Sequence, residues 1–265
     1  MKEKLKRYVK KLLKVFTRKE LRVLPGNIAF FSVLALIPII TIIIWIASYF
    51  SISIDSVVSN IENIFPPAVS DIVVKFISGR GFDSSLGTFT IFAFFIASNG
   101  TYAIISSSNT LYNVEKSDAV KDRIKSVILL IILITLIVFL LLVPMFGNKI
   151  INLISDSYIA KELLTILRFL KWPITFLIIY CNLKLIYTIA PSEQILSKDT
   201  TYGALFTTVI WTIATAIFSY YLQYFARYDI IYGNLSSLII LMIWIYLLAY
   251  VFVFGMAINT INMKK

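Results

Sequence analysis

The chain has 265 residues, of which 59% are hydrophobic and 15% charged, with a formal net charge of +11 and no histidine. Soluble domains are closer to half apolar and a quarter charged, so this composition indicates an integral membrane protein. The lack of histidine excludes a histidine base and His-ligated metal sites, and the single cysteine, Cys181, excludes an internal disulfide.

The first 27 residues are strongly basic. Apolar residues recur at helical spacing among the lysines, at Leu5, Val9, Leu12, Leu13 and Phe16. This pattern predicts a cytoplasmic amphipathic helix that lies on the anionic inner leaflet. Because the positive charge is concentrated next to the first apolar run, it favours a membrane topology signal, and we predict no nucleic-acid partner.

Residues 28–265 are predicted to form an all-α membrane domain, a bundle of six transmembrane helices. A helix needs roughly 20 apolar residues to cross a bilayer. Six runs satisfy this length: Ile28–Tyr49, Leu86–Ser107, Ser126–Phe146, Phe169–Ala190, Thr201–Tyr224 and Ser236–Ile261. Positive charge in the 109–125 connection and at the C-terminus predicts that both termini are cytoplasmic.

The predicted outer connections contain amphipathic patterns. Apolar residues recur at helical spacing over 54–64 and 69–77, on either side of Pro66 and Pro67, and again over 163–170 before the fourth run. These patterns predict short amphipathic helices. They either pack on the bundle at the interface or form the wall of a cavity open to the outer leaflet.

Acidic residues cluster in the 109–125 connection, where Glu115, Asp118 and Asp122 share one helix face. Such carboxylates could hold a divalent metal for phosphodiester hydrolysis. However, Lys121 and Lys125 follow Asp118 and Asp122 by three residues, a spacing that favours ion pairs along an exposed helix. The sequence also has no phosphate-binding glycine loop. We therefore predict no catalytic residue, metal or cofactor.

Polar residues within the apolar runs are candidate functional groups, because they are costly in a membrane. The stretch from Ser98 to Asn109 carries several, and it either packs helices together or lines a polar cavity. Lys184 either extends to the interface or is a buried cation beside Asn182.

The stretch Ile231–Ser237 reads IYGNLSS, between the last two apolar runs. Gly233 is predicted to supply a turn, and Asn234 or Ser236 to cap the last helix. Alternatively, this helix N-terminus and Arg227 could receive a lipid phosphate. The candidate residues for a lipid head group are thus Asn27, Asn99, Asn109, Lys184, Arg227, Asn234 and Ser236.

Four segments in order resemble the YihY/BrkB family of bacterial inner-membrane proteins: LPGNIAFFSVLALIP (24–38), NTLYNVE (109–115), the spacing from Pro191 to Gly203-Ala204, and the run from Tyr232 to Asn259. The resemblance covers nearly the whole chain and implies six helices and a location in the cytoplasmic membrane. This family has carried a ribonuclease label, widely regarded as a misassignment, and a virulence label, and proposals around it concern envelope lipids. Two departures stand out: Ala257 lies where the family usually has Glu, and Tyr202 where proline is common.

Three hypotheses follow. The first is a transporter or flippase-like protein that binds an amphipathic envelope lipid or lipid-linked precursor, without ATP hydrolysis of its own. The second is a non-transporting scaffold for envelope or division machinery. The third, a membrane nuclease acting through Glu115, Asp118 and Asp122, is disfavoured by the lack of histidine and of a cytoplasmic domain.

Overall fold

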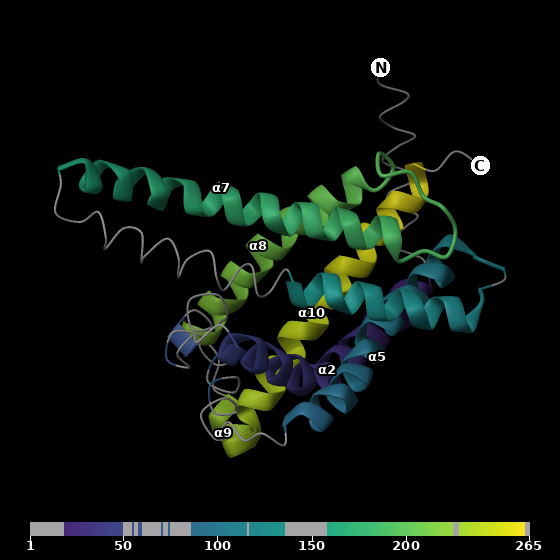
Figure 1. The fold of residues 1–265 in the computed structure, drawn as a ribbon, viewed down its shortest axis with the longest axis horizontal. Coiled ribbons are helices and arrows are strands. Elements are labelled where there is room, and N and C mark those ends of the chain that lie inside the picture. Colours follow the sequence, from purple (N-terminus) through teal and green to yellow (C-terminus); the bar gives the residue numbers. More distant parts are fainter. Residues whose placement is uncertain are drawn as a thin grey trace.

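The computed structural model describes residues 19–49, 86–115, 117–135, 158–224 and 228–262, and isolated positions between 55 and 74. Within these residues all regular structure is helical. The elements are α2 (Glu20–Tyr49), α5 (Leu86–Tyr112), a helix over residues 119–135, α7 (Tyr158–Ile189), α8 (Thr201–Tyr224), α9 (Tyr228–Tyr232), the 3-10 turn η1 (Gly233–Leu235) and α10 (Ser236–Asn262) (Figure 1). The predicted all-α class is confirmed for this part of the chain.

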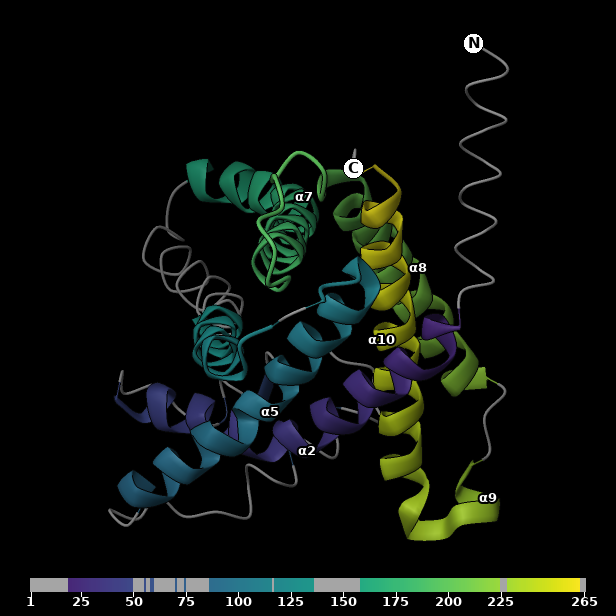
Figure 2. The ribbon, with the colours of Figure 1, turned by 90° about the vertical axis from the view of Figure 1, so that its right-hand side faces the viewer.

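Helix α10 is central to the packing. It lies against α2 and α8, while α2 runs along α5 and α7 packs on α8 (Figure 2). The 119–135 helix joins the α2–α5 pair, because its Leu130 and Ile134 are buried with Ala35 and Ile42 of α2 and with Ala97 of α5.

The faces of α8 are inverted relative to those of a helix in a soluble protein. Its buried residues are mostly small or polar: Gly203, Ala204, Thr207, Thr208 and Phe218. Its exposed face carries an apolar and aromatic stripe of Tyr202, Leu205, Val209, Ile213, Ile217, Tyr220 and Tyr224. A soluble helix buries its large apolar residues. This arrangement is expected where hydrocarbon is the solvent and helices approach through small residues.

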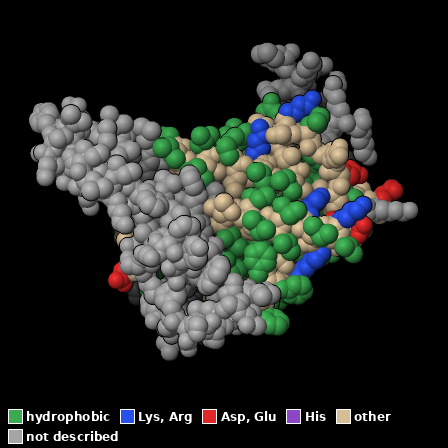
Figure 3. All heavy atoms as spheres, in the orientation of Figure 1, with side chains coloured by type: hydrophobic (Ala, Val, Ile, Leu, Met, Phe, Trp, Pro, Cys, Tyr) green, Lys and Arg blue, Asp and Glu red, His purple; other side chains and the backbone are tan. Residues whose placement is uncertain are grey.

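Helix α5 repeats the inversion, with exposed Phe92 and Phe95 and buried Ser98, Thr101 and Ser107. Apolar side chains cover much of the described surface in Figure 3, and most visible charged side chains lie towards the side where α5 ends. By length and hydropathy, two described helices could cross a membrane: α8, and α10 from Ser236 to Ile261. Only 17% of the apolar segment of α8 is buried, whereas the core helix of a soluble protein would be mostly buried. The count of six spans stays a prediction.

Two helices are longer than the apolar runs predict. Helix α2 begins at Glu20 and passes through Pro25, so the predicted boundary between residues 27 and 28 lies inside it. Helix α7 is continuous through Pro173, and it joins the predicted amphipathic segment 163–170 to the fourth run. The predicted amphipathic helices in 1–18 and 54–77 lie outside the described residues, apart from isolated positions in the latter.

The turn in IYGNLSS is confirmed, because Gly233 has a φ of +51°, a conformation that favours glycine. The predicted capping by Ser236 is wrong. Ser236 has helical angles, φ −54° and ψ −45°, and its backbone N–H donates to the carbonyl of Gly233. The 3-10 turn therefore leads directly into α10 without a capping residue at this position. Arg227 and the side chain of Asn234 lie outside the described residues.

Candidate functional site

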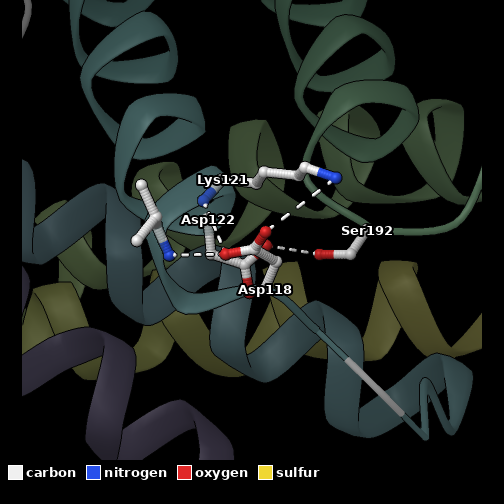
Figure 4. Close-up of polar contacts among 5 residues, drawn as sticks. Asp118, Lys121, Asp122 and Ser192 are labelled. Carbon is white, nitrogen blue, oxygen red and sulfur yellow. Dashed lines mark hydrogen bonds and ion pairs between the residues drawn. The ribbon is translucent and has the colours of Figure 1, made fainter.

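A buried polar cluster joins the end of α5, the start of the 119–135 helix and the α7–α8 connection. The Asn109 amide nitrogen donates to Asp122 Oδ2 at 3.1 Å and to Ser192 Oγ at 2.8 Å. The Ser192 hydroxyl donates to Asp122 Oδ1 at 2.6 Å, and its backbone N–H donates to Asn109 Oδ1 at 2.8 Å. We call Asn109, Asp122 and Ser192 the Asp122 cluster; the contact between Asp122 and Ser192 is visible in Figure 4.

The exposed acidic face predicted for the 109–125 connection is wrong at Asp122, which is only 4% exposed. Its carboxylate points inward to Asn109 and Ser192 rather than along the helix. Asp118 does behave as predicted: it is exposed and lies 3.9 Å from Lys121 Nζ (Figure 4). Asp118 Oδ1 also accepts the backbone N–H groups of Val120 and Lys121, and so caps the helix.

Lys125 lies beside the cluster, and its ammonium donates to the carbonyl oxygen of Pro191 at 2.8 Å. Burial lowers the pKa of Lys125, and the negative charge of Asp122 partly offsets this effect. Burial also raises the pKa of the Tyr112 phenol, with a smaller contribution from the negative charge of Asp199. The α7–α8 connection is therefore held to the ends of two other helices by charged and polar contacts.

Several buried polar atoms have no hydrogen-bond partner among the described residues. They are Ser107 Oγ, Ser108 Oγ and Tyr112 OH in the last turns of α5, and Asn259 Nδ2 near the end of α10. An unsatisfied buried donor or acceptor costs about 1–3 kcal/mol. Such groups require an unseen partner, which water or a polar ligand can supply.

Helices α8 and α10 cross at glycines. The Gly203 N–H donates to Asn259 Oδ1 at 2.7 Å, and a Cβ at Gly203 would overlap the carbonyl oxygen of Gly255. A Cβ at Gly255 would overlap Thr207 Oγ1, which itself lies 2.8 Å from the Tyr187 hydroxyl. Close backbone approach through glycine is typical of membrane helix pairs. We call Gly203, Thr207, Gly255 and Asn259 the glycine crossing.

Of the seven residues predicted for head-group binding, only Asn109 belongs to the Asp122 cluster. Asn99 lies on α5 and accepts a hydrogen bond from Arg123 Nη1 at 2.8 Å. Lys184 is partly exposed on α7, with Nζ 6.0 Å from the centroid of the Tyr180 ring, and both alternatives for it, extension to the interface or a buried cation beside Asn182, stay predictions.

The remaining candidates are dispersed. Asn27 is partly exposed within α2, and Ser236 begins α10 at the end opposite to Asn259. Arg227 and the Asn234 side chain are not described. No described contact joins the five described candidates into one site, and the binding roles of all seven stay predictions.

Sequence reasoning did not select Ser192, Tyr112 or Arg123. Ser192 follows Pro191 in a short polar connection and carries no signal of its own. Arg123 was visible only as one of several basic residues near Asp122, and its role depends on a partner 24 residues earlier. Within the described residues, no group of three or more His, Cys, Asp or Glu side chains could hold a metal ion.

Comparison with known proteins identifies the family. A family model described as virulence factor BrkB matches residues 12–265. The chain belongs to the BrkB family. It is 31% identical to the ribonuclease-like protein YfkH of Bacillus subtilis (strain 168), over 97% of this chain and 96% of that protein. It is 23% identical to a UPF0761 membrane protein of Haemophilus influenzae (strain 86-028NP), over 88% and 86% of the two chains. No solved structure matches.

Segments that carry the resemblance to the BrkB family meet at the contacts described above. Asn109 begins NTLYNVE and anchors the Asp122 cluster, while Gly203, Gly255 and Asn259 form the glycine crossing. Ala257, where the resemblance to the family implies Glu, is fully buried in α10. A carboxylate at this position would have to be desolvated.

Proposed function

We propose that this BrkB-family membrane protein binds an amphipathic envelope lipid or lipid-linked precursor and moves it across the bacterial cytoplasmic membrane. The observation that carries the proposal is the set of buried polar atoms without a partner among the described residues, three in the last turns of α5 close to Asn109 and one in α10. They lie inside a protein whose exposed helix faces are apolar.

The chemistry of these groups fits a polar head group. Two hydroxyls of α5, the Tyr112 phenol and the Asn259 amide can donate hydrogen bonds without disrupting any contact between described residues. Lys125 adds a nearby positive charge. Acyl chains would meanwhile remain in the surrounding hydrocarbon, against faces such as the exposed stripe of α8. No ATP-binding motif is present, so we propose movement without ATP hydrolysis by this chain.

The purified protein in liposomes with fluorescent lipid analogues tests the proposal. We expect the fluorescent lipids of the inner leaflet to reach the outer leaflet faster than they do in empty vesicles. Tyr112→Phe should slow the movement at least several-fold, because it removes an unpartnered hydroxyl. Thr110→Val is the matched control, since its exposed hydroxyl bonds only to the carbonyl of Ser106 in the same helix. No movement above empty vesicles with anionic and polyprenyl-linked lipids would reject the proposal.

A scaffold is the second candidate, and one observation favours it. Every polar side-chain atom of Asn109 is engaged with Asp122 or Ser192, as expected of a purely structural contact. A scaffold predicts a stable partner among envelope or division proteins in crosslinked pull-downs. It also predicts that Tyr112→Phe and Thr110→Val are equivalent in all lipid assays.

The name of YfkH suggests a ribonuclease, but the carboxylates of this chain favour no such activity. Asp118 caps a helix and pairs with Lys121, Asp122 points into the buried cluster, and Glu115 is exposed between helices. These three groups therefore do not converge as a shared metal site requires. RNA cleavage by purified protein that disappears in the triple Ala variant would overturn this view.

A further inference from the structure

Among the described residues, the half-buried Arg123 is a cation without an ionic partner. Arg123 donates through Nη1 to Asn99 Oδ1 at 2.8 Å and through Nη2 to the Phe95 carbonyl at 3.3 Å. Its guanidinium carbon lies 4.3 Å from the centroid of the Phe95 ring and 6.0 Å from that of Tyr102. Both hydrogen-bond acceptors are neutral, so they orient the guanidinium, and no described residue balances its charge.

The nearby carboxylates on its own helix are engaged elsewhere. Asp118 caps that helix and pairs with Lys121, and Asp122 accepts hydrogen bonds from Asn109 and Ser192. Among the described residues, Arg123 forms no ion pair. Charged groups in membrane helices pair with one another or with backbone carbonyls, and among the described residues Arg123 has only the second kind of partner, the Phe95 carbonyl.

Large apolar side chains are exposed on both helices that carry this contact. On α5 they include Phe92 and Ile96, which lie close to Phe95 in the sequence, and on the 119–135 helix they are Val120, Ile124, Ile128 and Ile131. The inverted faces of α5 and α8 indicate that such surfaces contact lipid. An acyl chain could therefore lie against α5 or against the 119–135 helix while the guanidinium contacts a head group.

We propose that Arg123 and Asn99 form a binding site for the phosphate of an anionic glycerophospholipid on the outer surface of the bundle. A guanidinium has five N–H donors, and the described contacts use two of them. The rest can bind phosphate oxygens, for which the planar fork of arginine is suited. The Asn99 amide nitrogen makes no hydrogen bond within the described residues and supplies a further donor. The site lies outside the bundle, so it does not depend on lipid transport.

Native mass spectrometry of the full chain, titrated with phosphatidylglycerol or phosphatidylcholine, tests this site. We expect phosphatidylglycerol to bind at least tenfold more tightly than phosphatidylcholine, and Arg123→Leu to abolish that preference. Lys121→Leu is the matched control: it removes the same charge from the same helix, but its ammonium is highly exposed and pairs with Asp118. It should change phosphatidylglycerol binding less than twofold.

Asn99→Ala keeps the positive charge of Arg123, and it tests the site in case the Arg123→Leu variant does not fold. It should weaken phosphatidylglycerol binding about three- to tenfold, because the guanidinium loses its main side-chain contact. Equal losses in the Arg123 and Lys121 variants would overturn the proposal. So would equal binding of the two lipids by the wild-type protein. Displacement of the lipid by millimolar inorganic phosphate would show a site for free anions and would also overturn it.

Discussion

Replacement of Gly203 by alanine tests the glycine crossing directly. The added Cβ would overlap the Gly255 carbonyl oxygen and Asn259 Oδ1, so α8 and α10 would have to separate. That separation would also stretch the hydrogen bond from the Gly203 N–H to Asn259, now 2.7 Å. Overpacking costs about 1–3 kcal/mol, and loss of a hydrogen bond about 1 kcal/mol.

Gly26→Ala provides the matched control. Gly26 lies within α2, and an added Cβ there would meet nothing within 4 Å. Alanine is favoured over glycine in a helix by about 1 kcal/mol, and both variants share this gain. We therefore expect Gly203→Ala to be less stable than Gly26→Ala by about 2–4 kcal/mol.

Unfolding in mixed micelles, followed by circular dichroism, measures this difference. The free energy of unfolding should fall for Gly203→Ala and rise by up to about 1 kcal/mol for Gly26→Ala. If the two variants agree within about 0.5 kcal/mol, the backbones of α8 and α10 are not in close contact and the reasoning fails.

Further changes test the polar contacts. Asn109→Ala should lower the free energy of unfolding by about 2–3 kcal/mol, because it leaves buried partners unsatisfied. Thr110→Ala, in the same turn, should cost under about 0.5 kcal/mol. Equal losses for the two variants in micelle unfolding would contradict this. Burial lowers the pKa of Lys125, so the unfolded chain binds that proton more tightly than the folded protein does. The free energy of unfolding should therefore rise with pH between the lowered pKa and the usual lysine pKa of about 10.4. Lys125→Met should flatten that rise in unfolding curves taken at successive pH values. Trp211→Phe removes the 2.9 Å hydrogen bond from the indole N–H to the Leu248 carbonyl of α10, and should cost about 0.5–1.5 kcal/mol in the same assay; an unchanged midpoint would show that this bond contributes nothing.

The helices were predictable because hydropathy is a local property. The runs that begin near 28, 86, 201 and 236 all lie within helices of the structure. The ends of α2 and α7 were less predictable. Changes from basic or amphipathic to apolar pattern placed boundaries after residue 27 and before residue 169, yet both helices continue across them and pass through Pro25 and Pro173. Packing against neighbouring helices overrides such local signals.

The Asp122 cluster could not be predicted from spacing. The spacing of three residues correctly joined Asp118 to Lys121, since both partners share one turn. The same rule failed at Asp122, whose partner Ser192 lies 70 residues further along the chain. Contacts between distant segments depend on how the helices cross. The spacing of residues along a single sequence does not show which helices cross or where.

The Asp122 cluster also constrains how the bundle can move. Asn109 and Asp122 both form hydrogen bonds with Ser192. We therefore expect one rigid body that consists of the end of α5, the start of the 119–135 helix and the α7–α8 connection. The glycine crossing fixes α8 to α10 close to one end of each helix. Any opening would then be a hinge about this end. Since about 30 Å of α10 lie between the crossing and Ser236, a rotation of about 10° would displace that end, beside Gly233, by about 5 Å.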